Sequence, residues 1–271
     1  MRRWWLDFKG RYCVGTSAVQ PTLRSSGAPT AGHQARSGGT RYIFTRPGVA
    51  SCRCRPLTLN VGLIKRLSVL HKLHRTSACI IGAYVAAHLF NHLLALKSVE
   101  AHIQFMESFR YVYRNPFAEV LLLACATFQV VSGVYFIQNR WGQRHGFFER
   151  VQTLSGGYLA YFLLVHVGAV LFGRAALKLD TNFYYAAAGM HVPPFQYYFV
   201  PYYFLAVVAI FGHIACAVHW LIRDNLSEAT RNYSGYTVLV VGVVAATLIV
   251  AAFAGAFYDI KVPQEYRATY Q

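Results

Sequence analysis

Two histidines hold matching positions in two apolar stretches of this chain. His88 follows Ser77 by eleven residues, and His166 follows Ser155 by the same spacing. If both stretches are helices that run in the same direction, a rise of about 1.5 Å per residue puts each imidazole about 16 Å beyond its serine, near the middle of a membrane. Two neutral imidazoles at one depth can bind the two faces of a haem iron. The alternative is that each histidine only hydrogen-bonds a neighbouring helix.

Two further apolar stretches carry polar side chains at a second level. Gln129 and His213 each lie thirteen residues beyond the start of their stretch, counted from Pro116 and Val200. Polar groups at membrane depth are costly and by default indicate function. The sequence therefore predicts two layers, His88 with His166 and Gln129 with His213.

The remaining histidines receive weaker assignments. His92 lies one turn beyond His88 and could replace it as a ligand or hydrogen-bond the edge of a haem. His219 lies near a predicted membrane boundary, where snorkelling to water or contact with a partner is expected. Three more are expected in loops without a chemical role: His102, His145 and His191. A zinc or di-iron site would need carboxylates or cysteines around these histidines, and Glu119 is the only acid within an apolar stretch.

The elements that must position these side chains are long and apolar. The chain is 55% hydrophobic and 13% charged, whereas soluble domains are about a quarter charged. Five stretches reach the length of about 20 residues that crosses a bilayer: Thr76–Leu96, Pro116–Gln138, Thr153–Phe172, Phe199–Ile222 and Tyr236–Tyr258. A soluble protein with five buried helices is disfavoured because these stretches lack polar faces. The expected fold is all-α, an integral membrane bundle of five transmembrane helices with a four-helix haem-binding core.

The formal charge of +16 is concentrated at the N-terminus. Residues 1–60 hold ten Arg or Lys and one acid, a net charge of +9, in a stretch rich in Ser, Thr, Gly and Ala. This composition is typical of a mitochondrial transit peptide. A nucleic-acid-binding tail is the alternative, but its basic residues would usually be clustered. We expect residues 1–60 to be disordered or removed.

The other segments follow from the five spans. Residues 61–75 are expected to form a basic entry segment on the inner side of the membrane, followed by the transmembrane domain at 76–258 and an outer-side tail at 259–271. The positive-inside tendency places the N-terminus on the matrix side, although the bias is modest.

The order of these features resembles the cytochrome b membrane anchor of succinate:quinone oxidoreductases and quinol:fumarate reductases. The resemblance is to the five-helix, single-chain form of the anchor and covers about residues 65–260. It rests on the entry segment Ser68–Ser77 with His71, His74 and Arg75, on the mid-membrane histidines, and on the loop that runs from Ala101 to Arg110. Gly133-Val-Tyr and the Ser-Gly opening at Ser155 agree with the same order.

This resemblance implies a haem-containing anchor of complex II that passes electrons from an iron–sulfur subunit to ubiquinone. His88 and His166 match the ligands of one haem b, and His213 matches half of a second ligand pair. Gln129 stands where the other half is expected and is a poor iron ligand, so we predict one haem and a possible quinone contact at His213. His74, Arg75 and Ser77 match a quinone entry, although Arg75 and His74 could instead contact lipid phosphates or haem propionates.

The expected partners are a flavoprotein, an iron–sulfur protein and the membrane, with room for another small membrane subunit and no nucleic acid. The chain itself would be a non-catalytic or quinone-reducing subunit in the mitochondrial inner membrane. Two alternatives remain open: a haem-poor structural subunit of a respiratory complex, and a different b-type cytochrome membrane subunit. The segment Leu179–Gly189 is expected to form a re-entrant or surface-lying cap over the outer end of the bundle.

Overall fold

The computed structural model describes residues 61–140 and 146–270. The chain divides into two units, residues 1–63 and 64–271, and the helix Val61–Leu94 begins in the last residues of the first unit. The proposed transit segment, residues 1–60, and His145 lie outside the described residues.

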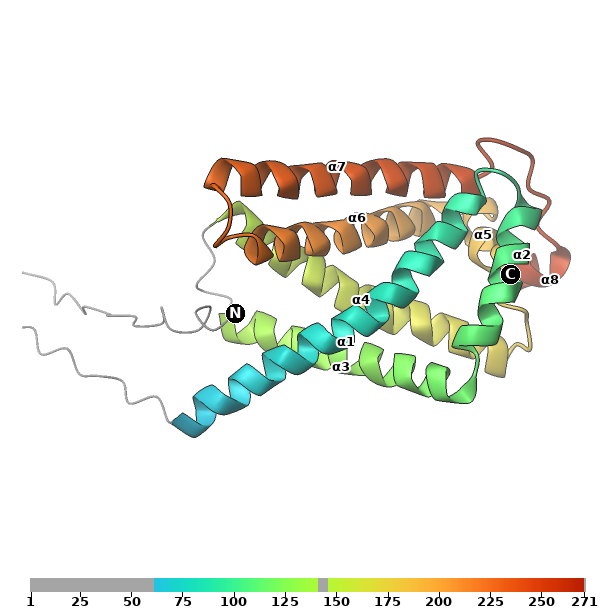
Figure 1. Cartoon of the computed structure of the whole chain (residues 1–271). Coiled ribbons are helices and arrows are strands. Elements are labelled where there is room, and N and C mark those ends of the chain that lie inside the picture. The colour runs from blue at the N-terminus through green and yellow to red at the C-terminus, as the bar shows by residue number, and fades with distance from the viewer. Residues whose placement is uncertain (1–60, 141–145, 271) are drawn as a thin grey trace, which may run out of the picture. The chain divides into compact units, whose positions relative to one another are not determined.

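Five long helices dominate the second unit and confirm the predicted all-α fold (Figure 1). Each is long and apolar enough to cross a bilayer. They are α1 (Val61–Leu94), α3 (Pro116–Arg140), α4 (Phe147–Ala175), α6 (Gln196–Leu221) and α7 (Glu228–Phe253). Consecutive long helices run in opposite directions, which is the expected up-and-down order.

Several helices begin before the predicted apolar stretches. α1 starts at Val61, so the expected entry segment, residues 61–75, continues into the first span as one helix. α7 begins at Glu228, where the Ser227 hydroxyl accepts a hydrogen bond from the Thr230 N–H. Hydrophobicity marks only the lipid-covered part of a helix, whereas polar first turns are set by capping groups.

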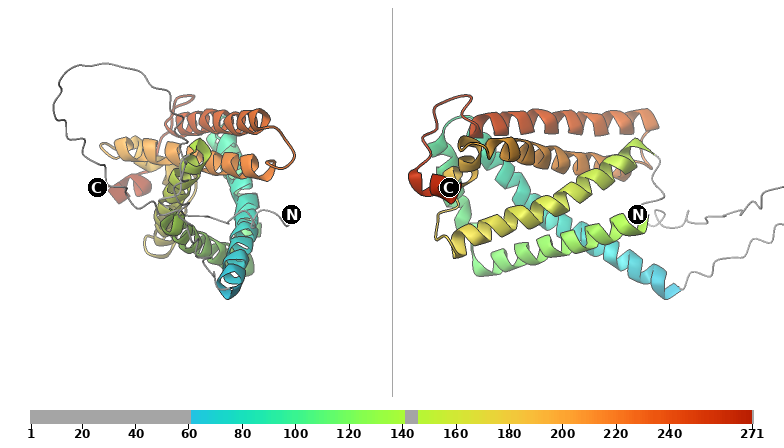
Figure 2. Two further views of the ribbon diagram at one scale, coloured as in Figure 1. Left: turned by 90° about the vertical axis from the view of Figure 1, so that its left-hand side faces the viewer. Right: turned by 180° about the vertical axis from the view of Figure 1, so that it is seen from behind.

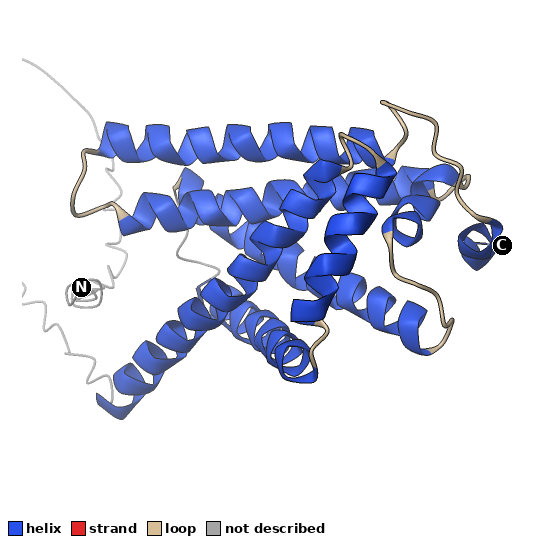
Figure 3. Ribbon diagram, turned by 45° about the vertical axis from the view of Figure 1, so that its right-hand side comes forward, coloured by secondary structure: helices blue, strands red, loops and turns tan. Residues whose placement is uncertain are grey.

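Three short helices lie together at one end of the bundle (Figure 3). They are α2 (Val99–Tyr113), α5 (Phe183–His191) and α8 (Gln264–Arg267), and a 3-10 turn, η2 (Ala268–Tyr270), follows α8. We call this the cap end, and the opposite end, where α1, α4 and α7 begin, the entry end. Side-chain caps fix the first two starts: Ser98 accepts from the Ala101 N–H, and Asn182 from the Tyr184 N–H.

These short helices correct two expectations. The segment Leu179–Gly189 is mainly the start of helix α5, whose buried face packs at the cap end around Phe183 and Ala187. His102 and His191 belong to helices α2 and α5, not to loops. The apolar spacing of α2 was obscured by its polar face, and α5 is too short to stand out by hydrophobicity.

Helix packing differs strongly between the two sides of the bundle. α6 and α7 lie side by side, and α4 packs against α6. Seen from the entry end, α1 and α4 lie on opposite sides (Figure 2). About a third or more of the α6 and α7 spans is buried within the chain, against 11% for α1. The apolar sides of α1, α3 and α4 are therefore left for lipid or for other protein.

Candidate functional site

His88 of α1 and His166 of α4 face each other inside the bundle. Their ring centres are 6.1 Å apart, and the ring planes are inclined by 60°. The two helices do not pack closely against each other, so the imidazoles meet across the space between their backbones. The sequence spacing predicted this pair, and the structure brings it together.

Aromatic rings hold both imidazoles on the helices that carry them. Tyr84, one turn before His88, stacks on it with ring centres 5.6 Å apart. Phe162, one turn before His166, stacks in the same way at 4.9 Å. Side chains four residues apart share a helix face, so each histidine is presented by an aromatic neighbour of its own helix.

His88 also begins a chain of buried polar groups that leads to the cap end. Its Nε2 lies 3.1 Å from Nε2 of His92, and Nδ1 of His92 lies 3.1 Å from Nε2 of His102. Asn91 Nδ2 lies 3.2 Å from the same atom of His102. Burial, and then the positive charge of Arg110, lowers the pKa of His102 to about 4. His102 is therefore neutral near pH 7 and adds no positive charge to this series of hydrogen-bonded side chains.

The second level differs from the predicted pair of Gln129 and His213. Gln129 Nε2 donates to the His74 carbonyl at 2.6 Å and to Ser77 Oγ at 2.8 Å, so its amide is used to join α3 to α1. The imidazole that lies within electrostatic reach of His213 is His74. Because α1 begins at Val61, His74 belongs to the same helix as the first span. The sequence had placed it in an entry segment ahead of that span.

Serines orient the two imidazoles of this second level. His74 Nδ1 lies 2.7 Å from Ser132 Oγ, and His213 Nδ1 lies 3.3 Å from Ser155 Oγ. Neither Nε2 has a hydrogen-bond partner among the described residues. A Cβ on Gly156 would lie 3.4 Å from Cε1 of His213, an ordinary van der Waals contact, so Gly156 packs beside this ring. Each imidazole is thus held by Nδ1, and its Nε2 remains available.

The other predicted quinone residues are placed differently. The Ser77 hydroxyl is buried and donates to the Leu73 carbonyl at 2.9 Å, while it accepts the Gln129 amide. Arg75 is exposed on α1. A hydroxyl that already donates within its helix is not free to donate to a ligand, so His74 is the residue of this set with an available ring nitrogen.

His219 corrects another expectation. It is buried, with 6% of its surface exposed, and stacks on Phe148 with ring centres 4.0 Å apart. It therefore neither snorkels to water nor lies on a surface for a partner. Its place on α6 beside the start of α4 makes it a packing residue.

The geometry of His88 and His166 fits a six-coordinate haem iron. An iron about 2 Å from each ligating nitrogen, with about 1 Å more to each ring centre, separates the two centres by about 6 Å. The observed 6.1 Å agrees with this separation. The nitrogens of His166 have no hydrogen-bond partner among the described residues. His88, in contrast, would have to break its hydrogen bond with His92 before it could bind a metal.

No family model matches this chain, and no match is found among curated proteins or solved structures. The geometry above and the resemblance seen in the sequence are therefore the basis for a proposed function.

Sequence reasoning missed the residues that orient the imidazoles. Ser132, Ser155 and Asn91 are buried polar groups that bond histidines from other turns or helices. One signal was present for His102, because Val99, His102 and Met106 share one face of α2. That spacing predicts that His102 is buried, while its partner His92 becomes evident only from the fold.

Proposed function

We propose that this chain is the haem-containing membrane anchor of a respiratory succinate dehydrogenase, complex II, and that it passes electrons from an iron–sulfur subunit to quinone. The observation that carries the proposal is the pair His88 and His166, whose rings face each other at 6.1 Å from two helices on opposite sides of the bundle. The mitochondrial inner membrane, the matrix-side N-terminus and the flavoprotein and iron–sulfur partners are parts of the same proposal.

His88 and His166 would hold one haem b. The bound group supplies a one-electron carrier in the middle of the membrane. The chain's own contribution is to hold His88 against Tyr84 and His166 against Phe162 by ring stacking. To hold the group through Nε2, His88 would have to give up its hydrogen bond with His92, and His92 would keep its Nδ1 contact with His102.

Quinone would bind at the level of His74 and His213. A quinone carbonyl needs hydrogen-bond donors, and both rings have Nδ1 placed on a serine and Nε2 unengaged. The Ser132 hydroxyl donates to the Phe128 carbonyl, and the Ser155 hydroxyl donates to the Gln152 carbonyl, so both serines accept from Nδ1. Each Nε2 is therefore an acceptor that can receive a hydrogen bond or a proton from quinol.

A reduced-minus-oxidised absorption spectrum of the purified full chain tests the proposal. We expect a b-type haem band, and we expect a flavoprotein and an iron–sulfur protein to purify with the chain from its native membrane. Absence of the band would leave a haem-poor structural subunit. A band without those partners would indicate a different b-type cytochrome.

A further inference from the structure

A pocket at the cap end is lined by one face of α2. Its lining residues recur every three or four positions, the spacing of a single helix face: Glu107, Arg110, Tyr111, Arg114 and Asn115. The pocket has a volume of about 450 Å³. The neighbouring face of α2, with Val99, His102 and Met106, is buried. α2 is too short to cross a bilayer, so this face lies at the end of the spans, where lipid headgroups are found.

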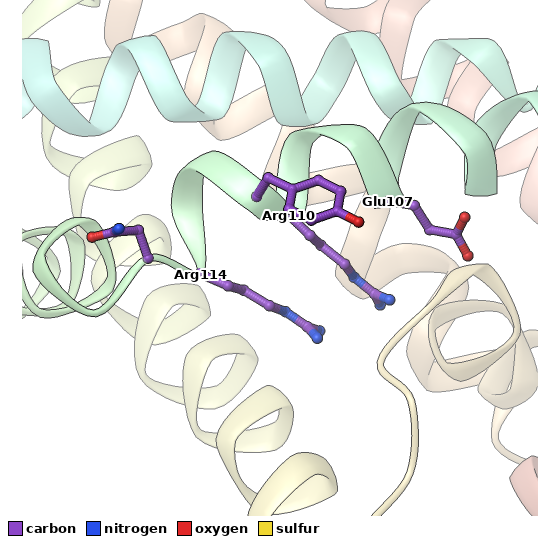
Figure 4. Close-up of a pocket in the computed structure, with 5 residues that line it drawn as sticks. Glu107, Arg110 and Arg114 are labelled. Carbon is purple, nitrogen blue, oxygen red and sulfur yellow. The ribbon is translucent and has the colours of Figure 1, made fainter.

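Two arginines in the pocket are held in place by the segment between α4 and α5. Arg110 Nη2 lies 2.7 Å from Asp180 Oδ1, and Arg114 Nη2 donates to Thr181 Oγ1 at 3.1 Å. Figure 4 shows both side chains extending from α2 in the same direction. Arg114 Nε is buried and has no hydrogen-bond partner in the described structure. The guanidinium is therefore positioned but has a donor to spare.

The charges around the pocket balance. Arg110 and Arg114 are offset by Asp180 and by Glu107, which is exposed and forms no ion pair with a described residue. A simple anion would gain little net attraction here and would lie near the Glu107 carboxylate. A group with one negative and one positive charge matches both the arginines and Glu107.

An exposed apolar surface begins where the pocket ends. α3 follows Asn115 directly, and its first turns expose Phe117 (88%), Val120 (67%) and Leu121 (50%). These side chains share one face of α3, and aromatic residues are common at this depth of a membrane protein. Acyl chains that run along α3 would place their headgroup at the pocket.

We propose that this pocket binds one glycerophospholipid with a primary amine headgroup, of the phosphatidylethanolamine kind. The phosphate accepts hydrogen bonds from Arg114 and Arg110, and the ammonium donates to Glu107. A choline headgroup carries the same charges but cannot donate a hydrogen bond to Glu107. The site is separate from the histidines of the proposed haem and does not depend on them.

Native mass spectrometry of the full chain tests the proposal. The protein is released from nanodiscs that contain equal amounts of phosphatidylethanolamine, phosphatidylcholine and phosphatidylglycerol, and the retained lipids are counted. We expect about one retained phosphatidylethanolamine per chain. Its retention should exceed that of either other lipid about fivefold, because a charge-assisted hydrogen bond at a partly exposed site contributes a preference of about this size. Equal retention of the three headgroups would overturn the proposal.

Substitutions at the two ends of the headgroup make the test sharper. Arg114→Gln should lower retention of phosphatidylethanolamine about fivefold, whereas Arg150→Gln at the entry end should leave it unchanged. Glu107→Gln gives the pocket a net positive charge, so the preference should move to phosphatidylglycerol. Glu100→Gln, an exposed acid on the same helix but outside the pocket, is its control. If Glu107→Gln leaves the order of the three lipids unchanged, the ammonium contact does not exist and the proposal fails.

Discussion

The two levels of histidine differ in which ring nitrogens are engaged. We call the pair His88 and His166 the upper level and the pair His74 and His213 the lower level. At the lower level, His74 and His213 are each held through Nδ1 by a serine of another helix. At the upper level, His166 has no such partner in the described structure, and His88 is bonded through Nε2 to His92. A second partner fixes the orientation of a ligating imidazole and makes it more basic. The lower pair is therefore oriented before any ligand binds, and the upper pair is positioned mainly by stacking on aromatic rings.

Removal of either upper histidine should abolish the proposed haem band. We expect His88→Ala and His166→Ala each to remove the b-type absorption, because one remaining imidazole leaves the opposite face of the iron without a ligand. His71→Asn is the control, since it removes an imidazole from the same helix near the entry end. His219 is a poorer control because its ring is buried, whereas His71 is only half-buried. A band that survives both alanine variants contradicts the ligand assignment.

Removal of either lower histidine should separate quinone chemistry from haem binding. His74→Ala and His213→Ala should lower the rate of quinone reduction about tenfold or more, as expected for loss of a proton-transfer group. Both should leave one haem per chain, measured by the pyridine haemochrome assay against protein content. A ratio of two haems that falls to one in these variants would show that the lower imidazoles hold iron.

At the residue level, the sequence predicted how deep a polar side chain lies in the membrane better than it predicted the direction in which that side chain points. Equal spacing from Ser77 and Ser155 correctly paired His88 with His166, because a helix converts residue number into height. The same counting paired Gln129 with His213, whereas the Gln129 amide turns toward α1. Depth along a helix follows from spacing, but the direction of a side chain depends on how the helices are rotated and tilted, which spacing does not contain.

Among the helices, α6 and α7 form the tightest contact because small residues let them approach. Ala215 of α6 is buried, as are Gly242 and Ala246 of α7. A Cβ on Gly242 would collide with the side chain of Phe211. Close approach of this kind replaces the hydrophobic effect as the source of helix association in lipid.

Gly242→Ala should therefore destabilise the protein even though alanine favours helices. We expect the overpacking against Phe211 to cost about 1–3 kcal/mol, visible as a lower thermal unfolding midpoint in detergent. Gly168→Ala is the matched control, because a Cβ there has nothing within 4 Å. It should leave stability unchanged or raise it by up to about 1 kcal/mol. Equal effects of the two substitutions would show that α6 and α7 do not pack through Gly242.

The five spans and a cap at Leu179–Gly189 were predicted from the sequence, but the short helices of the cap end were not. Long apolar runs report lipid contact directly, so α3 was located to within two residues at its end. α5 is nine residues long and is defined by the Asn182 cap and by burial of Phe183, Ala187 and Met190. Such a helix gains its stability from tertiary packing more than from its own sequence, which explains why hydrophobicity alone suggested only a surface cap.

Across the whole molecule, the two ends of the bundle differ in whether their basic side chains form ion pairs. At the cap end, Arg110 is paired with Asp180, and Arg174 with Glu119 at 2.5 Å. At the entry end, Arg66, Lys72 and Arg75 of α1 have no ion pair with a described residue, and the +9 segment of residues 1–60 precedes them. Unpaired basic residues beside a span are the ones that resist translocation across a membrane.

Labelling in sealed vesicles should place the two ends on opposite sides of the membrane. In a cysteine-free background, Asn225→Cys probes the turn between α6 and α7 at the entry end, and Lys178→Cys probes the segment after α4 at the cap end. For the mitochondrial location and orientation proposed above, we expect an impermeant maleimide, added to intact mitoplasts, to label Lys178→Cys and to reach Asn225→Cys only after permeabilisation. Labelling of both positions in intact mitoplasts is incompatible with the up-and-down order of five spans. Labelling of Asn225→Cys alone would agree with five spans but would show the opposite orientation in the membrane. In that case the unpaired positive charge of the entry end would have crossed the membrane.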